Sequence, residues 1–179
     1  MITNRTGEAN SDLYRYTLSR TECAQPGSEL QMFTPQDPEF EKRVRHSFSE
    51  QRVMATFGAE LKRVAPGIIH IEMPYHEDFT QQHGFLHAGV IATLLDSACG
   101  YAAFSLMPSD AAVLAVEFKV NLMAPVRGDV LSARAEVKRA GRTLTICTAD
   151  AYTITDGEEK LVAAMQGTIM NVVGRGISG

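Results

Sequence analysis

The sequence predicts an α+β domain in which a curved antiparallel sheet wraps around one long central helix. Several short β-prone runs are joined by tight turns, which favours antiparallel pairing. A single run over residues 84–107 is apolar on nearly all sides, so a helix formed there needs cover on nearly all sides. A lone curved sheet keeps an open edge and an outer face, so dimerisation is expected.

The composition favours a soluble globular protein and excludes several partners. The chain has 179 residues, which suits one domain and an appendage. A net charge of −4 gives no overall attraction to nucleic acid or to an anionic membrane surface, so any anionic ligand must meet a local cluster of Lys and Arg. Cys23, Cys99 and Cys147 are odd in number and far apart, which indicates a reducing, cytoplasmic location.

The first segments are an extension and a helix. Residues 1–36 are polar and form a predicted N-terminal extension without the apolar core of a secretory signal, and the domain is expected over residues 37–175. Residues 37–58 predict an amphipathic helix. Asp37 is its expected N-cap and Pro38 its first helical residue.

The strands follow in two groups. Pro-Gly at positions 66 and 67 predicts a hairpin between residues 59–64 and 68–73. The Asp156-Gly157 pair, between β-branched runs, is a strong signal for another hairpin. The strands expected after the apolar helix are residues 112–124, 129–139, 143–155 and 160–173.

The apolar helix begins in a way that suits anion binding. A loop containing Gly84 leads into a helix expected to start between His87 and Gly89. The first-turn N–H groups of a helix lack intrahelical partners and lie at the positive end of its dipole. Such groups can hold an anion or a developing oxyanion, and the small residues Ala88 and Gly89 let a ligand carbonyl approach closely.

Asp96 is the one carboxylate inside the apolar run. Inserting an Asp side chain at the centre of a bilayer costs roughly 2.5–3.5 kcal/mol, which favours a buried core helix over a membrane span. A carboxylate lying over small side chains is partly desolvated and still reachable by a ligand. Asp96 is therefore either a reactive group or a structural one that accepts hydrogen bonds from a loop. The small residues on its face are Gly89, Ala92, Thr93, Cys99, Gly100 and Ala103.

Other chemistry is less favoured by the residues around the helix. His83 and His87 could bind a metal with Asp96 only if the loop folded back, so no metal is expected. Loop anchoring is the preferred role for His83. Ser97 lacks a Gly-x-Ser-x-Gly elbow and nothing depresses the pKa of Cys99, so both are expected to pack.

The stretch from His87 to Asp96, His-Ala-Gly-x6-Asp preceded by Gln-Gln-His-Gly-Phe-Leu, resembles the PaaI-like acyl-CoA thioesterases of the hotdog superfamily. The resemblance covers roughly residues 40–173. In that family a curved antiparallel sheet wraps a long helix. The resemblance implies hydrolysis of acyl-CoA thioesters without a metal or an organic cofactor.

The resemblance also implies roles for particular residues. Asp96 resembles the catalytic carboxylate, which acts as nucleophile or as general base. The backbone N–H of Ala88 would polarise the thioester carbonyl, and Gly89 matches the next residue of the family triplet. His87 resembles a positioning residue, and Gln81 resembles the side chain that contacts the carbonyl or the lytic water.

An oligomer with shared sites is a further implication. The family forms homodimers or homotetramers with sites across the dimer interface. Gly89 and Asp96 lie roughly 11 Å apart along one helix, which fits such an arrangement. Ala115 stands where some relatives have Ser or Thr, so the residue that positions water is left open.

Coenzyme A carries phosphates, so cations are expected at the entrance of the substrate-binding site. The candidates are Arg127 and a turn that contains Lys138, Arg139 and Arg142, although solvated turn charges explain any single one equally well. Phe85 and Tyr101 could line an acyl pocket that is aromatic or aliphatic.

Two alternatives to thioester hydrolysis remain open. A hotdog enoyl-CoA hydratase or dehydratase would use His83 or His87 with Asp96 to move protons. A non-catalytic acyl-CoA-binding protein would bind without turnover, although no helix-turn-helix or basic arm supports a regulatory version of that role.

Overall fold

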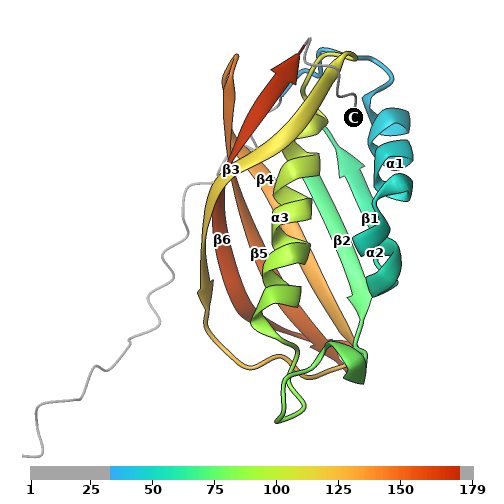
Figure 1. Ribbon diagram of the computed structural model, residues 1–179, viewed down its shortest axis with the longest axis vertical. Helices are drawn as coiled ribbons and strands as arrows, with labels where there is room; N and C mark the ends of the chain where they lie inside the picture. Colours follow the sequence, from blue (N-terminus) through green and yellow to red (C-terminus); the bar gives the residue numbers. More distant parts are fainter. Residues whose placement is uncertain (1–32, 174–179) are drawn as a thin grey trace, which may run out of the picture. The chain divides into compact units, whose positions relative to one another are not determined.

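Six strands form one antiparallel sheet that curves around a long helix, as predicted (Figure 1). The computed structural model describes residues 33–173. The strand order is β1-β2-β4-β5-β6-β3, so β1 and β3 are the edges. The elements are α1 (Phe40–Glu50), α2 (Arg52–Phe57), β1 (Glu60–Ala65), β2 (Ile68–Pro74), the 3-10 helix η1 (Glu77–Phe79), α3 (Ala88–Phe104), β3 (Ala111–Leu122), β4 (Val130–Ala140), β5 (Leu144–Thr155) and β6 (Glu158–Val173).

The core lies between α3 and the concave face of the sheet. α3 packs against β2 through β6, and α1 packs against its other side. Leu94, Leu95 and Ala98 are completely buried, which confirms the prediction that this apolar helix is covered on nearly all sides. No helix within residues 33–173 is long and apolar enough to cross a membrane.

The hairpin turns have the backbone that their residues predict. Gly67 has a φ of 73°, and an added Cβ there would lie 3.0 Å from the Phe33 ring. Asp156 and Gly157 both have positive φ, 51° and 82°. Positive φ at both central residues matches the right-handed twist of the flanking strands. The predicted pairings of β1 with β2 and of β5 with β6 are confirmed.

The predicted single helix over residues 37–58 is wrong in two details. It is broken at Gln51, whose extended backbone (φ −79°, ψ 97°) separates α1 from α2. Val44 and Met54 are both fully buried, although on one continuous helix they would point about 80° apart. The break therefore allows both side chains to face the core. The helix also begins at Phe40 with Glu39 as its N-cap, so Asp37 is not the N-cap and Pro38 is not the first helical residue. The Asp37 carboxylate instead accepts the N–H of Glu39 and pairs with Arg43.

Packing begins before the expected boundary between residues 36 and 37. Phe33 packs against the core, and the N–H of Gln36 donates to the carbonyl of Leu106 over 3.4 Å. The rest of the predicted extension, residues 1–32 with Cys23, lies outside the described residues, as do residues 174–179.

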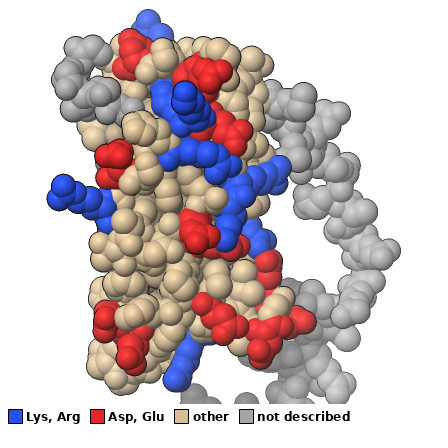
Figure 2. Space-filling view, turned by 90° about the vertical axis from the view of Figure 1, so that its right-hand side faces the viewer, with Lys and Arg blue, Asp and Glu red and all other residues tan. Residues whose placement is uncertain are grey.

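One face of the molecule carries interspersed charges. Figure 2 shows Lys and Arg side chains lying among Asp and Glu over the side formed by α1, α2 and the neighbouring strands. Some of these charges pair directly, as in Arg45 with Glu41 on α1 and Lys62 with Glu60 on β1. This face is therefore not a uniformly basic surface of the kind that binds nucleic acid.

Candidate active site

The loop before α3 is held by its own backbone. Gln81 donates its N–H to the carbonyl of Phe85 over 2.8 Å, and the N–H of Gly84 donates to the carbonyl of Gln81 over 3.0 Å. Gly84 has a φ of 77°, which favours glycine, and its carbonyl accepts the Tyr75 hydroxyl at 2.8 Å. These bonds fix Gln81 beside the start of α3.

His87 caps the N-terminus of α3. Its extended backbone (φ −63°, ψ 140°) leads into the helix, and its Nδ1 accepts the N–H of Gly89 at 2.9 Å. In a neutral imidazole with Nδ1 as acceptor, the proton is on Nε2. Within residues 33–173 the N–H of Ala88 has no hydrogen-bond partner, and Ala88 is exposed. The cap therefore occupies one of the two expected oxyanion donors and leaves the Ala88 amide for a ligand.

Gln81 and Ala88 line one cleft at the mouth of the helix, the mouth cleft, with a volume of about 340 Å³. The Gln81 side-chain oxygen accepts the N–H of His83, and its NH₂ group has no partner among the described residues. Two free donors in an otherwise apolar cleft suit a carbonyl that gains negative charge. The other residues of the cleft are Phe85, Leu86, Ile91, Leu122, Met123, Ala124, Pro125 and Val126.

Asp96 lies two turns farther along α3, roughly 12 Å from Ala88. Its carboxylate is half-buried, and it makes no hydrogen bond or ion pair with any residue of the described range. The structural alternative, in which a loop donates hydrogen bonds to Asp96, is therefore not found there. Burial raises the pKa of Asp96 above its ordinary value.

Asp96 borders a second cleft, the Asp96 cleft, with a volume of about 460 Å³. This cleft shares no lining residue with the mouth cleft, so one chain does not bring Asp96 together with Gln81 and Ala88. Its lining residues are Ser47, Glu50, Gln51, Asp96, Ser97, Gly100, Tyr101, Ala112, Val113, Leu114, Ala115 and Ile169.

The sequence did not identify the contribution of α1 to this cleft. Ser47 and Gln51 reach it because α1 docks over the C-terminal half of α3 and breaks at Gln51. The Ser97 hydroxyl lies 3.4 Å from the side-chain oxygen of Gln51. Ala115 also lines the cleft, as expected from its alignment with a water-positioning residue, but it has no hydroxyl.

The other reactive side chains near α3 are packed or exposed. Cys99 is fully buried, and burial raises the pKa of its thiol, as it raises the pKa of Cys147 to about 12. A thiol held neutral in this way is a poor nucleophile. His83 is exposed on the loop, and residues 33–173 contain no group of His, Cys, Asp and Glu arranged to hold a metal.

The predicted cations are divided between the two ends of the sheet. Arg127 directly follows Val126, which lines the mouth cleft. Lys138, Arg139 and Arg142 lie near the hairpin between β4 and β5, so the length of β4, roughly 33 Å, separates this turn from Arg127. Lys138 pairs with Glu136, a partner on its own strand. Only Arg127 lies near the mouth cleft of the same chain.

Phe85 and Tyr101, the expected acyl contacts, lie in different clefts. Phe85 lines the mouth cleft and Tyr101 the Asp96 cleft. The Tyr101 ring makes an edge contact with Phe48 of α1 at a centroid distance of 5.6 Å.

Comparisons with known proteins agree with the fold. The model of the thioesterase superfamily matches residues 83–160, from the loop before α3 into β6. A thioesterase family protein from Silicibacter pomeroyi is 55% identical, with a TM-score of 0.74 over 75% of this chain and 99% of that one. A protein of Halobacterium salinarum that is named as an esterase is 31% identical over 58% of this chain and 72% of its own length. The PaaI protein of the E. coli phenylacetic acid degradation operon is 20% identical, with a TM-score of 0.68 over 76% of this chain and 95% of that one, and shows the shared fold. The chain therefore belongs to the thioesterase superfamily, a family of thioester hydrolases with the hotdog fold.

Proposed function

We propose that this protein hydrolyses acyl-CoA thioesters to a free acid and coenzyme A, with Asp96 as the reactive carboxylate. The observation that carries the proposal is the half-buried carboxylate of Asp96, which has no partner among the described residues and borders a cleft. A carboxylate that stabilises neither a loop nor an ion pair is available for chemistry.

The donors of the mouth cleft would act on the thioester carbonyl. The N–H of Ala88 and the side-chain NH₂ of Gln81 would donate to the carbonyl oxygen, and the positive end of the α3 dipole would favour the charge that develops there. His87 supports this geometry by holding Gly89 and so fixing the first turn of the helix.

Asp96 can complete hydrolysis in two ways. As a nucleophile, it attacks the carbonyl carbon and forms an acyl anhydride while the carbon–sulfur bond breaks and coenzyme A leaves as thiolate. Water then cleaves the anhydride. As a general base, Asp96 takes a proton from water, the resulting hydroxide attacks the carbonyl, and the proton goes to the leaving thiolate. The free acid and coenzyme A are the products in both cases.

A free-thiol release assay with purified protein and short, medium, long and aromatic acyl-CoAs tests this function. We expect thiol release from saturated acyl-CoAs. Hydration of an enoyl-CoA without thiol release would instead indicate the hydratase, and tight binding without turnover would indicate a non-catalytic protein.

The role of the Ala88 amide can be tested by removing one hydrogen atom. Ala88 is the first residue of α3, where proline is well tolerated, and the extended backbone of His87 suits a residue before proline. Ala88→Pro should therefore fold normally and lower kcat by about 10²–10³-fold, the usual effect of losing one oxyanion donor. Ala88→Gly keeps the N–H and should lose far less activity in the same assay. Equal rates in the two variants would exclude this amide as a donor.

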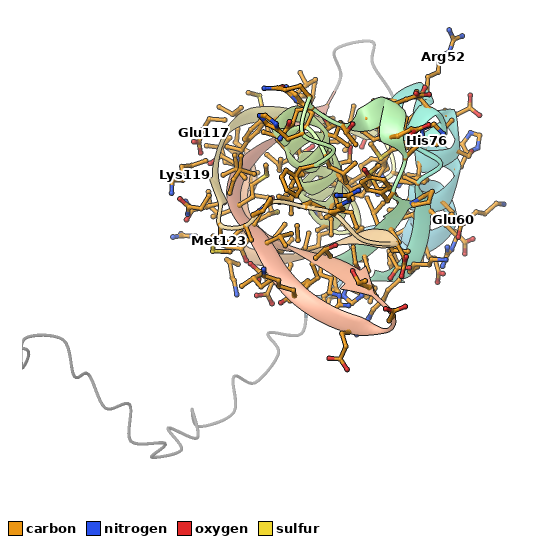
Figure 3. All side chains as sticks on the ribbon, turned by 90° about the horizontal axis from the view of Figure 1, so that it is seen from below. Arg52, Glu60, His76, Glu117, Lys119 and Met123 are labelled. Atoms are coloured by element: carbon orange, nitrogen blue, oxygen red, sulfur yellow. The ribbon has the colours of Figure 1, made fainter. Side chains whose placement is uncertain are left out.

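We further propose that the active unit is a dimer formed through the β3 edge. β3 has an unpaired edge, and Leu114, Val116 and Phe118 are 52%, 50% and 44% exposed. Glu117 and Lys119, which alternate with these apolar residues, are exposed as well, and Figure 3 shows them along one side of the molecule. Such an apolar open strand is a surface that pairs with a second chain.

The positions of the two clefts favour the same dimer. The Asp96 cleft includes Ala112 and Leu114 from the start of β3, and the mouth cleft includes Leu122 at its end. A twofold axis that pairs two β3 strands antiparallel would place the start of one strand beside the end of the other. The Asp96 cleft of each chain would then adjoin the mouth cleft of its partner.

A charge placed on this edge should separate the subunits. We expect Phe118→Lys to convert a wild-type dimer to monomers in sedimentation velocity, and to lose thioesterase activity at the same time. Val53→Lys is the matched control, because Val53 is also 38% exposed but lies on α2, outside the sheet. A Phe118→Lys protein with the mass of the wild type would contradict the proposed interface.

A further inference from the structure

Gly100 is a helix-interior residue that the fold does not require. It lies one turn beyond Asp96 in α3 and has no positive φ. Glycine in a helix interior is less stable than alanine. A Cβ added at Gly100 would meet no atom within 4 Å, whereas its neighbours Cys99 and Ala102 are completely buried. Neither the backbone nor the packing of the described residues explains this glycine.

The space beside Gly100 belongs to the Asp96 cleft. Asp96 and Gly100, four residues apart, point to the same side of α3. Because Gly100 has no side chain, the space beside Asp96 continues to Tyr101, which also lines the cleft and makes an edge contact with Phe48. Its volume of about 460 Å³ is in the range of small-molecule sites.

The charges of this cleft do not suit the nucleotide part of coenzyme A. The titratable residues that line it are Asp96, Glu50 and Tyr101, and no Lys, Arg or His is among the lining residues. Burial raises the pKa of Tyr101, so its phenol stays neutral. Phosphates need cations, and two carboxylates would repel them.

The remaining walls suit an uncharged chain with an apolar and a polar side. Val113 and Ile169 of the sheet supply an apolar wall, and Ser47 and Gln51 of the α1 end supply hydroxyl and amide groups. An acyl group can lie between these walls with its carbonyl next to Asp96. A second carboxylate at the far end of an acyl chain would lie near Glu50.

We infer that the Asp96 cleft binds the acyl group and that Gly100 sets its size, so that the protein accepts uncharged acyl groups of medium length and disfavours carboxyacyl groups. This inference rests on the proposed thioesterase function. Gly100 is then a specificity-determining residue, because its missing side chain provides the room that a longer acyl chain occupies.

Filling this room should change substrate preference. We would measure kcat/KM by free-thiol release with acetyl-CoA, octanoyl-CoA and octanedioyl-CoA. Gly100→Leu should lower the ratio of octanoyl to acetyl kcat/KM by at least about tenfold, since a single displaced methylene is worth roughly 10–200-fold in such pockets. Gly100→Ala should lower the ratio less and raise the midpoint temperature of unfolding, because it removes a helix-interior glycine. Wild-type protein should cleave octanedioyl-CoA at least about tenfold more slowly than octanoyl-CoA.

The matched control is Ala55→Leu, which adds a comparable side chain to an exposed position of α2 that lines neither cleft. It should keep the wild-type ratio. An unchanged ratio in both Gly100 variants would overturn the inference while the wild-type activity still supports the proposed function. Equal rates with octanoyl-CoA and octanedioyl-CoA would overturn the part of the inference that says carboxyacyl groups are disfavoured. No thiol release by the wild-type protein would instead overturn the proposed function, and the inference with it.

Discussion

Replacing Asp96 with asparagine is expected to lower kcat by about 10²–10⁴-fold, the usual contribution of a positioned acid or base. The amide keeps the shape of the side chain but can neither attack a carbonyl nor take a proton from water. The measurement is thiol release by purified variant and wild type on the best acyl-CoA. Asp150→Asn, at an exposed position of β5, is the matched control and should keep the wild-type rate. Near-normal turnover by Asp96→Asn would show that the proposed mechanism is wrong.

The same substitution should not destabilise the fold. Burial raises the pKa of Asp96, so the folded state holds this proton more tightly than the unfolded state. That contribution to stability is fully present below the unfolded pKa, about 3.9, and is lost as pH rises through the folded pKa. At pH 7 the ionised side chain therefore costs stability, which Asp96→Asn removes.

Urea unfolding at pH 7 and near pH 4 tests whether ionisation of Asp96 lowers the free energy of unfolding. At pH 7 the variant should have a free energy of unfolding equal to or above that of the wild type, and the advantage should shrink toward pH 4. A variant that is clearly less stable at pH 7 would indicate a structural role for Asp96. Loss of activity without loss of stability separates the two interpretations that the sequence left open.

Mixed dimers would show which subunit supplies each half of the site. Asp96→Asn and Ala88→Pro should each have at most about one hundredth of the wild-type activity on their own. If the site is shared, one of the two sites in a mixed dimer combines an intact carboxylate with an intact mouth cleft. Random association should then restore about a quarter of the wild-type activity. A site contained in one subunit would regain none.

Local chemistry explains why much of the fold could be predicted from the sequence. The turn at Asp156-Gly157 needs only two residues that tolerate positive φ, and the helix from Ala88 needs only a long apolar run between breakers. The break at Gln51 has no such local signal. It arises because α1 and α2 must both present buried residues to the same core, which is a tertiary requirement.

The sequence predicted the candidate residues but not how the structure distributes them between two clefts. The spacing of Gly89 and Asp96 along the helix already fitted a site shared between two chains, and the structure places Ala88 and Asp96 in separate clefts. The difference between the Ala88 and Gly89 amides depends on the orientation of the His87 ring, which no sequence pattern encodes. The separation of Arg127 from Lys138 depends on the length and direction of β4.

Arg43 holds the end of α3, a role that the sequence did not reveal. Its Nη1 donates to the carbonyl of Pro108 at 2.6 Å, and its Nη2 donates to the carbonyl of Met107 at 2.7 Å. The guanidinium also lies 4.2 Å from the centre of the Phe104 ring. Its Nε is 3.0 Å from the carboxylate of Asp37, and only 12% of the Arg43 side chain and 9% of the Asp37 side chain are exposed. One cation thus satisfies carbonyls beyond the last turn of the helix and neutralises a buried acid.

Arg43→Met should therefore lower the free energy of unfolding by about 3–5 kcal/mol, the usual cost of removing one partner from a buried ion pair. Methionine can fill part of the space over Phe104, but it leaves the buried Asp37 carboxylate without its cation and takes the guanidinium donor from the Met107 carbonyl. Urea unfolding at pH 7 measures the loss. Arg45→Met is the matched control on the same helix, because the exposed pair of Arg45 with Glu41 is worth at most about 0.5 kcal/mol.

A double-mutant cycle separates the ion pair from the carbonyl contacts. Asp37→Asn removes the buried charge, so the loss in Arg43→Met combined with Asp37→Asn should be smaller than the sum of the two single losses, by about 0.5–3 kcal/mol. Strict additivity would mean that Arg43 acts only through the carbonyls of Met107 and Pro108. The Arg43 contacts also affect the candidate site, because they hold α1 in place and Ser47, one turn after Arg43 on α1, lines the Asp96 cleft. Loosening the Arg43 contacts should therefore also reduce thioester turnover at temperatures below global unfolding, whereas Arg45→Met should leave it unchanged.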